Sequence, residues 1–312
     1  MLEQLEVSCI TIDLPFRLNH VHCFVAKGEN GWTIMDSGLN NTVTEKSWTP
    51  ILANHDITNI IITHYHPDHY GYAGRLQEVT GANVFMTETD KKAARTIWGK
   101  GFSHFLREKY YKCGIPKVIA DAMAETDEES ASQVSPHPRV DSHLNEGDKI
   151  LFGKYEYEVI KAPGHSSGLI CLYNREKRVL FSTDHILPKI TPNISYDFYG
   201  EDNPLERFLQ SLHKFKRLEA EYIIPSHGKP FKDANSRIDQ IIGHHNERLS
   251  KLHEIISTPA TVYDACQKLF GKAFNSHEMR FAIGETIAHL EYLVKKGECS
   301  KGEIDGNYIY TT

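Results

Sequence analysis

Four side chains of the types that bind metals follow a short apolar run in the first third of the chain. Residues 60–69 read Ile-Ile-Ile-Thr-His-Tyr-His-Pro-Asp-His, so His64, His66, Asp68 and His69 fall within six positions. One histidine is usually a surface or core residue, but that explanation fails for four such side chains directly after a buried strand. Neutral imidazole and carboxylate bind zinc at about 2.0–2.2 Å. The spacing therefore predicts that these four side chains converge on a metal.

Three later segments each place one ligand-type side chain just past an expected strand. His165 lies between two expected strands, and Asp184 and His227 each follow a strand directly. On an α/β scaffold, the loops at strand ends point into a common crevice. Five histidines and two aspartates are too many for one tetrahedral ion. They predict two ions about 3.5–4 Å apart that share a bridging carboxylate and a water.

The elements that must position these residues alternate between strand and helix as far as about residue 232. Apolar and β-branched runs predict strands at 6–13, 21–26, 32–35, 60–63, 83–87, 155–161, 169–173, 178–182 and 222–225. Helical spacing is expected at about 43–54, 70–79 and 205–218. This order predicts an α/β fold in which the ligand candidates follow the strands.

The motifs also resemble those of a known family. The H-x-H-x-D-H string, the P-G-H-S-S-G segment around His165, the Thr-Asp pair that ends at Asp184 and the S-H-G segment around His227 resemble the metallo-β-lactamase superfamily. Asp36, in Met-Asp-Ser-Gly, matches the first motif of that family. The resemblance covers about residues 7–232, with all motifs in family order. It implies a four-layer αββα sandwich with a dinuclear metal centre at one sheet edge.

The resemblance also implies a role for each ligand candidate. One metal would be held by His64, His66 and His165, the second by Asp68, His69 and His227, and Asp184 would bridge both. Zinc is the expected metal, although manganese or iron could occupy the same ligands. A water shared by the ions would titrate near neutrality and become the hydroxide nucleophile. Asp68 is expected to be catalytic as well, orienting or relaying the proton, and Asp36 is expected to accept a ligand N–H.

The family hydrolyses esters, thioesters, lactones, β-lactams and phosphodiesters, so the fold alone does not decide the substrate. Classical β-lactamases carry a cysteine where Asp184 stands, which disfavours a β-lactam substrate. Flavodiiron-type members carry a glutamate where His66 stands, which disfavours redox chemistry. The first reading is therefore a hydrolase that uses a metal-bridging hydroxide to cleave an ester, thioester or lactone of a small molecule.

An aromatic-rich segment at about 90–135 bears on that reading. It carries no strand signal and is expected to be a helical insertion. Its aromatic residues could line an apolar acyl pocket as a helical cap, or could simply pack the insertion onto the core: Trp98, Phe102, Phe105 and Tyr110. Tyr196, after the strand that precedes Asp184, could donate to a developing oxyanion or could pack.

The last part of the chain has a different pattern. Helices are expected at roughly 234–257, 261–270 and 277–296, followed by a hairpin that turns through Asp305-Gly306-Asn307. Three helices and a two-stranded wing predict a winged-helix domain over 233–312, after a metal-hydrolase domain over 1–232. This tail resembles that of a branch of the superfamily that includes an endoribonuclease.

A metal-dependent endoribonuclease is therefore the alternative function. A basic track near the site would favour it: Lys189, Arg207, Lys229 and Lys232. Residues 234–312, however, carry nine Lys and Arg residues, Lys272 among them, against ten Asp and Glu. Its candidate recognition helix carries Glu278, Glu285 and Glu291, which would repel phosphates. Packing or a homodimer contact is the preferred role for the tail.

Composition narrows the class of partner. The chain of 312 residues is 40% hydrophobic and has a formal net charge of −6, which argues against nucleic acid as the main partner. No stretch is long and apolar enough for a transmembrane helix, and the first residues lack the basic start of a signal peptide. The six cysteines form no C-x-x-C pair and are expected to be reduced thiols. We expect a cytoplasmic protein with a small-molecule substrate and no membrane partner.

Overall fold

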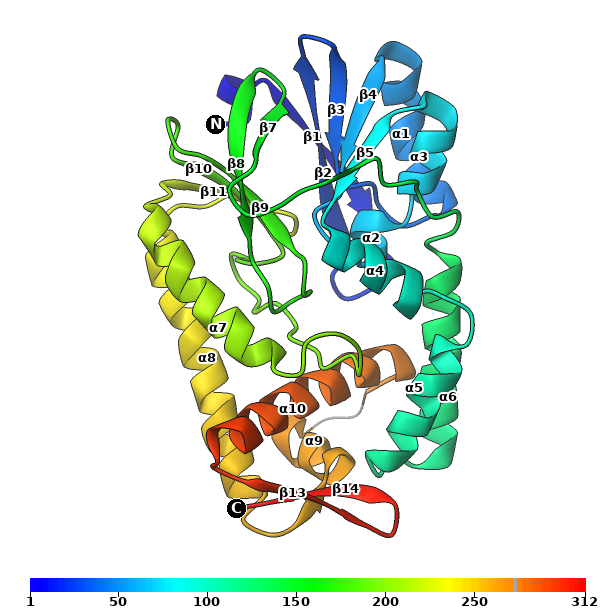
Figure 1. Cartoon of the computed structure of the whole chain (residues 1–312), viewed down its shortest axis with the longest axis vertical. Coiled ribbons are helices and arrows are strands. Elements are labelled where there is room, and N and C mark those ends of the chain that lie inside the picture. The colour runs from blue at the N-terminus through cyan, green and yellow to red at the C-terminus, as the bar shows by residue number, and fades with distance from the viewer. Residues whose placement is uncertain (272–273) are drawn as a thin grey trace.

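The computed structural model describes residues 1–271 and 274–312. Two β-sheets lie face to face in the upper part of Figure 1, and a helical part with a small third sheet lies below them. Lys272, one of the basic residues counted in the tail, and Ala273 lie outside the described residues. Within the described ranges, no helix is long and apolar enough to cross a lipid bilayer.

The first sheet has six strands and is mixed. Its strands, in spatial order, are β1 (Val7–Asp13), β2 (His20–Gly28), β3 (Gly31–Met35), β4 (Ile57–Ile61), β5 (Asn83–Met86) and β6 (Ser142–His143). The pairs from β1 to β3 are antiparallel, and those from β3 to β6 are parallel. Because β3, β4 and β5 run the same way, the segments that follow them emerge at one edge of the sheet.

The second sheet has five strands. In spatial order they are β11 (Tyr222–Pro225), β10 (Val179–Thr183), β9 (Ile170–Asn174), β8 (Tyr155–Lys161) and β7 (Lys149–Phe152). β10 and β11 are parallel, and β9 is antiparallel to both β8 and β10. The carboxyl ends of β8, β10 and β11 therefore share one edge. Every residue of β9 and β10 is buried, as expected for central strands covered on both faces.

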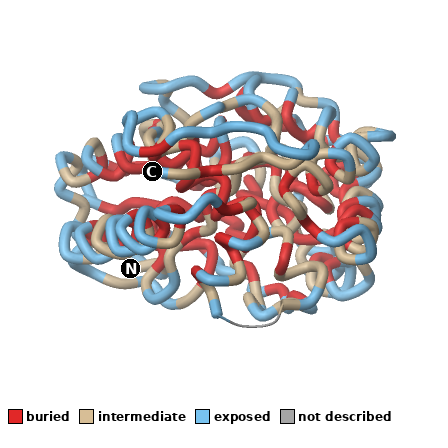
Figure 2. The backbone as a smooth tube through the Cα atoms, turned by 90° about the horizontal axis from the view of Figure 1, so that it is seen from below, coloured by how far each residue is buried: buried red, intermediate tan, exposed pale blue. Residues whose placement is uncertain are grey.

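Helices flank the two large sheets and form most of the helical part below them. They are η1 (Glu3–Leu5), α1 (Thr42–Asn54), α2 (Pro67–Tyr70), α3 (Ala73–Thr80), α4 (Glu88–Ile97), α5 (Phe102–Lys112), α6 (Lys117–Ser132), α7 (Pro204–Phe215), η2 (Lys216–Leu218), α8 (Ala234–Ile255), α9 (Val262–Phe270) and α10 (Ser276–Lys296). Trp48 of α1 and Leu76 of α3 pack with the outer residues of the first sheet. Phe208 of α7 and Ile241 of α8 pack with those of the second. A separate cluster fills the space between the sheets, and Figure 2 shows buried chain running through the middle of the molecule.

The C-terminal part consists of α8, α9, α10 and a small sheet. That sheet has the order β12 (Ala260–Thr261), β14 (Asn307–Thr311) and β13 (Ser300–Ile304). Capping boxes at Thr261 and Asn275 begin α9 and α10. In Figure 1, α10 runs across the molecule below the two large sheets, between α8 and the α5–α6 pair. The buried residues of α10 belong to the same cluster as the outer face of the second sheet.

Several expected elements are confirmed and some boundaries are wrong. The α/β class and the helical insertion are confirmed, as are the three C-terminal helices with their hairpin. The strand expected at 60–63 ends at Ile61, and the helix expected at 70–79 is two helices, α2 and α3. Asp68 and His69 therefore lie in a one-turn helix that Pro67 begins, because proline fits the first helical position. Neither β6 nor β7 was expected.

Candidate metal centre

The two large sheets bring all seven predicted ligands to one place. His64 and His66 lie in the loop after β4, and Asp68 and His69 lie in α2. The second sheet supplies His165 after β8, Asp184 after β10 and His227 after β11. Main-chain hydrogen bonds join the sheets near this edge, from Ile170 N to Thr63 O (3.1 Å) and from His22 N to Ser226 O (2.7 Å). The strand-end arrangement expected from the sequence is what the structure has.

His64, His66 and His165 form the first group of facing ligand atoms. His64 Nε2 lies 3.1 Å from His66 Nδ1, and both rings lie edge-on to the ring of His165. Burial, with the neighbouring histidines, holds the pKa of His64 and of His66 well below the ordinary value. Neutral rings present lone pairs, which is the form that binds a metal.

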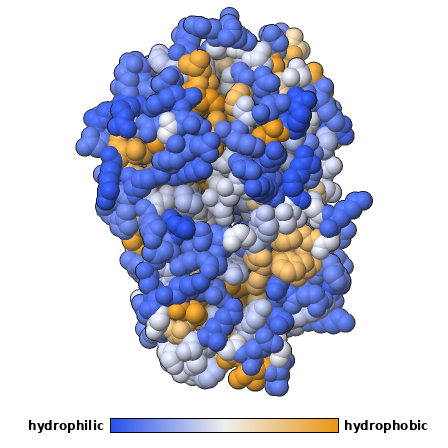
Figure 3. Space-filling view, in the orientation of Figure 1, coloured by the Kyte–Doolittle hydropathy of each residue, from blue (hydrophilic) through white to orange (hydrophobic). Residues whose placement is uncertain are grey.

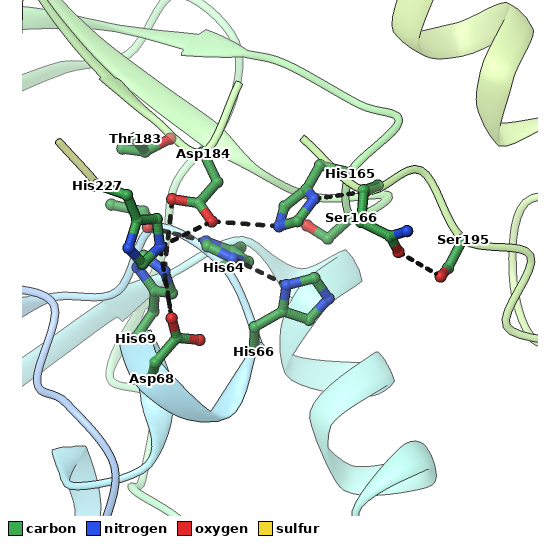
Figure 4. Close-up of polar contacts among 12 residues, drawn as sticks. His64, His66, Asp68, His69, His165, Ser166, Thr183, Asp184, Ser195 and His227 are labelled. Atoms are coloured by element: carbon green, nitrogen blue, oxygen red, sulfur yellow. Dashed lines mark hydrogen bonds and ion pairs between the residues drawn. The ribbon is translucent and has the colours of Figure 1, made fainter. Parts of the chain in front are cut away.

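Asp68, His69 and His227 form a second group, and Asp184 lies between the two groups (Figure 4). Asp184 Oδ2 is 3.4 Å from His165 Nε2 and 3.2 Å from His227 Nε2, while Asp184 Oδ1 is 3.5 Å from His69 Nε2. Asp68 Oδ2 is 3.5 Å from both His69 Nε2 and His227 Nε2. Four ligands about 2.1 Å from a tetrahedral ion lie about 3.4 Å from one another. These separations therefore fit ligands that surround ions.

The far nitrogens of three rings have fixed hydrogen-bond partners. His69 Nδ1 donates to Asp36 Oδ2 (2.8 Å), His165 Nδ1 to Asn193 O (2.7 Å) and His227 Nδ1 to His20 O (2.6 Å). Because these oxygens can only accept, each Nδ1 keeps its proton, and Nε2 is the ring nitrogen that can bind a metal.

The site contains buried polar atoms that no described residue satisfies. Within the described part of the chain, His69 Nε2, His165 Nε2, His227 Nε2 and Asp184 Oδ1 are all buried without a hydrogen-bond partner. Buried polar atoms are rarely left so, and each unpaired one costs about 1–3 kcal/mol. All four face the middle of the site. Nitrogen and carboxylate donors of this number and orientation fit divalent metal ions, zinc included.

In the second group, the histidines and the carboxylates shift one another's pKa values. Burial lowers the pKa of His69, but Asp68, Asp184 and Asp36 outweigh burial and hold it well above the ordinary value. Burial raises the pKa of Asp184, but His227 and His69 outweigh that effect and hold it well below the ordinary value. Burial raises the pKa of Asp68, but His69 and His227 outweigh that effect and lower it to about 2. Both carboxyl groups are therefore ionised, as metal binding requires.

Asp36 accepts the N–H of a ligand candidate, His69, as the sequence predicted. It directly follows β3, and besides the ring of His69 it accepts from Thr63 N (2.9 Å) and Thr63 Oγ1 (2.8 Å). The carboxylate thus joins the end of β3 to the loop that carries His64.

Two histidines that sequence reasoning left as structural support the ligand His227. His20 Nε2 accepts from Gly228 N (2.9 Å), and His22 Nε2 donates to Gly228 O (2.9 Å). Both lie in β2, two residues apart and thus on one face of the strand. That alternation of histidines was the signal in the sequence.

Asp90 of α4 joins the two ligand loops, and no motif marked it. Its carboxylate accepts from Ser166 Oγ (2.6 Å), Gly168 N (2.6 Å) and Tyr65 N (3.1 Å). Burial raises the pKa of Asp90 to about 6, and the three donors limit the rise. Asp90 therefore holds the loop of His165 against that of His64 and His66.

Other histidines lie outside the centre. His185, beside Asp184, points toward Ser211 Oγ (3.1 Å) and packs against Phe208 and Phe215. A separate group of His245, Glu285 and His289 joins α8 to α10. Its members contact one another and α8: His245 Nδ1 lies 3.0 Å from His289 Nε2, and Glu285 forms an ion pair with Arg248 at 2.7 Å.

A large cavity opens beside the ligands. Its volume is about 440 Å³, and its walls include His66, Asp68, His165 and Asp184. The remaining walls are mostly apolar side chains from the insertion, from the segment 187–198 and from α10: Ile97, Trp98, Phe102, Leu106, Ile190, Phe198, Phe281, Ile283 and Ile287. Figure 3 shows a hollow at the waist of the molecule, with apolar side chains gathered beside α10.

The four aromatic residues considered for the helical cap differ in whether they line this cavity. Trp98, Phe102 and Tyr110 line the cavity, whereas Phe105 does not and is 40% exposed. Tyr196 also lines the cavity and is half-buried. Of the two alternatives for Phe105, a place in the cavity wall is excluded, and its ring lies tilted against that of Phe102 on α5.

Comparisons with known proteins agree with this geometry. The "Probable metallo-hydrolase YqjP" of Bacillus subtilis is 24% identical over 98% of this chain and 97% of its own length. A "Hydroxyacylglutathione hydrolase" of Cereibacter sphaeroides is 24% identical over 76% of this chain and 69% of its own. The crystal structure of the metallo-beta-lactamase family protein TTHA1429 from Thermus thermophilus superposes with a TM-score of 0.88 at 28% identity, over 98% of each chain.

Family descriptions cover most of the chain. Residues 17–227 match the metallo-beta-lactamase superfamily, and residues 249–312 match its metallo-beta-lactamase-like C-terminal domain. The matched residues include all seven side chains of the centre. The fold, the clustered ligand candidates and the relatives together indicate that the protein is a metal-dependent hydrolase. The chain belongs to the metallo-beta-lactamase superfamily.

Proposed function

We propose that the protein is a dinuclear metal-dependent hydrolase that cleaves an acyl thioester, or a related ester or lactone, of a small molecule. The observation that carries this proposal is the apolar cavity that shares four of its wall residues with the ligand cluster. Its volume of about 440 Å³ falls within the range of about 300–1,000 Å³ usual for small-molecule sites.

The ligand groups support two ions. His64, His66 and His165 would hold one, and Asp68, His69 and His227 the other, with Asp184 facing both. When bound, zinc ions supply a water-derived nucleophile near neutral pH and polarise the acyl oxygen. Asp68, which borders the cavity, is placed to hold a proton between the ligand cluster and the substrate.

The cavity suits an acyl chain better than a phosphate backbone. Among the described residues that line it there is no lysine, and its arginines are paired, Arg17 with Glu278 (3.1 Å) and Arg280 with Asp127 (2.5 Å). The basic track weighed for RNA is not part of the described lining, and Arg207 pairs with Glu201 at 3.0 Å. A phosphodiester would meet few free cations here.

Among thioesters, esters and lactones, the name of one relative favours a thioester. The Cereibacter sphaeroides protein is named for a hydroxyacylglutathione, in which the acyl group is carried on a thiol. An apolar cavity next to the ligands would accept the acyl part of such a compound and leave the thiol part toward solvent.

We also assign the C-terminal residues 233–312 to a winged-helix domain that serves in packing. The three helices and the small sheet support this assignment. So does Glu285 in α10, which faces inward to Arg248 rather than outward to a nucleic acid.

The first test compares substrates. Zinc-loaded protein is incubated with a long-chain acyl thioester, an acyl lactone and a single-stranded RNA, each with an EDTA-treated control. Chelator-sensitive release of the thiol is expected, and it should be lost in His66→Ala. Cleavage of RNA alone would overturn the proposal in favour of the endoribonuclease.

A matched pair of variants tests the cavity. Phe102→Ala should raise KM for a long-chain thioester by about tenfold, because an aromatic contact with the acyl chain is worth about 1.5–3 kcal/mol. Phe105→Ala, on the same helix but outside the cavity, should leave KM unchanged. Equal effects of the two substitutions would contradict the assignment of the cavity to the acyl group.

A further inference from the structure

One ligand of the centre is held by a segment that lies on the C-terminal helices. The Nδ1 proton of His165 is donated to the main-chain oxygen of Asn193 at 2.7 Å. Figure 4 shows Ser195 on the side of His165 that faces away from the other ligands. The direction of the His165 ring therefore depends on where residues 193–195 lie.

Four hydrogen bonds fix that segment. The Asn193 amide Nδ2 donates to Phe281 O and to Glu285 Oε2, both at 3.2 Å, and Asn193 Oδ1 accepts from Ser195 Oγ at 2.7 Å. Tyr196 N donates to the main-chain oxygen of residue 284 at 3.0 Å. All three partners outside the segment belong to α10, so the segment follows the position of that helix.

Glu285 is itself held in place. Its side chain is buried, and its second oxygen, Oε1, forms an ion pair with Arg248 of α8 at 2.7 Å. Bonds to an ionised group are roughly twice as strong as neutral ones. The carboxylate thus joins α8, α10 and the Asn193 segment, at a distance from the seven ligand candidates.

We infer that Glu285 is a positioning residue of the metal centre, which sets the orientation of the ligand His165 through Asn193. This inference rests on the proposed role of His165 as a ligand. It gives the C-terminal helices a part in metal binding, although all seven ligand candidates lie outside these helices. Only the ion that His165 shares with His64 and His66 depends on this connection.

The test exchanges the hydrogen-bond donor and acceptor between positions 193 and 285. In Asn193→Asp a carboxylate faces the Glu285 carboxylate, and the two repel. In the double variant Asn193→Asp/Glu285→Gln, the new amide donates to the carboxylate at position 193, while its oxygen faces Arg248 in place of the ion pair. The measurement is the zinc bound at each of the two sites, titrated against a competing chelator, and the absorption spectrum of the cobalt-substituted protein.

Asn193→Asp should weaken one of the two zinc sites by about 10–100-fold, the usual effect of losing such an outer partner. The double variant should recover most of the loss and the cobalt spectrum of the unmodified protein. Tyr310→Phe, which removes the bond from Tyr310 to Glu291 of α10 at 2.6 Å and leaves the contact between Asn193 and Glu285 intact, should leave both sites unchanged.

Two results would overturn the inference: unchanged affinity at both sites in Asn193→Asp, or an equal loss at both sites that the double variant does not recover. If Asn193→Asp does not fold, Asn193→Ala replaces it, and the same weakening of one site is expected. Failure of the unmodified protein to bind two zinc ions would instead refute the proposed function, so the two failures are distinct.

Discussion

Single residues decide which nitrogen of each histidine faces the metal centre. Asp36 accepts a hydrogen bond from Nδ1 of His69, and it also accepts two hydrogen bonds from Thr63. Asp36 has a left-handed backbone (φ 62°), which aspartate and asparagine tolerate better than most residues. An asparagine at this position would therefore keep the turn and change only the hydrogen bonding.

Asp36→Asn should lower zinc affinity by about 10–100-fold. The amide of asparagine would donate to His69 Nδ1, which moves the ring proton to Nε2 and blocks the lone pair that faces the site. Chelator titration of zinc measures the loss. Thr63→Val is the control, because it removes one donor to Asp36 but leaves the acceptor for His69, and its loss should be smaller. A zinc affinity in Asp36→Asn equal to that of the unmodified protein would refute this role.

The residues that the sequence could not reveal act mostly through the main chain. The seven ligand candidates were predictable because histidine and aspartate directly after apolar strands are unusual. Asn193 holds His165, and His20 holds His227, through carbonyl oxygens that every residue possesses. No side-chain pattern can mark such a contact. Asp90 was missed because an aspartate in the first turn of a helix is ordinary until the fold places two loops against it.

At the scale of elements, the approach of α10 to the loop that follows β10 is set by Gly284. A Cβ added at this glycine would lie 2.5 Å from Ser195 Oγ and 3.0 Å from Ser195 Cβ. Glycine is therefore needed for close approach, although it weakens a helix interior by about 1 kcal/mol relative to alanine.

Gly284→Ala should displace the Ser195 segment and lower turnover by about tenfold. The free energy of unfolding should change by less than about 2 kcal/mol, since the gain in helix propensity offsets part of the overpacking. Gly243→Ala in α8 is the matched control, because no atom of the described residues lies within 4 Å of its added Cβ. It should stabilise the protein by about 0.4–1 kcal/mol and leave turnover unchanged. The same turnover in both variants would show that the close approach has no functional role.

Helices and strands were predictable where the sequence carries a strong local pattern. Strands β9 to β11 are mostly apolar runs, and α9 and α10 begin at capping boxes and end at glycines. β7 was missed because its four residues lie between Gly147 and Gly153 and alternate with exposed positions, so they read as a turn region. β6, of two residues, is shorter than any pattern can detect. The boundary of α2 depends on Pro67 and on the bond from Tyr70 N to His66 O at 2.9 Å.

At the scale of the whole molecule, the centre lies where three parts meet. Segments that follow the first sheet supply His64 to His69, segments that follow the second supply the other three ligand candidates, and α10 closes the cavity beside them. Buried unpaired nitrogens and ionised carboxylates at this junction destabilise the protein when no ion satisfies them. Metal binding should therefore hold the two sheets together as well as serve catalysis.

Removal of metal should lower the thermal stability of the whole chain. An ion present at 100 times its dissociation constant stabilises the native state by about 2.7 kcal/mol. In a chain of this size each kcal/mol shifts Tm by about 2–4 °C or somewhat less, so EDTA should lower Tm by roughly 5 °C. Differential scanning calorimetry at several zinc concentrations measures this, and Tm should rise with zinc. Asp184→Asn, which removes the carboxylate that faces both ligand groups, should show a much smaller dependence. A Tm that does not respond to zinc in the unmodified protein would mean that the two sheets are held together by their apolar core alone.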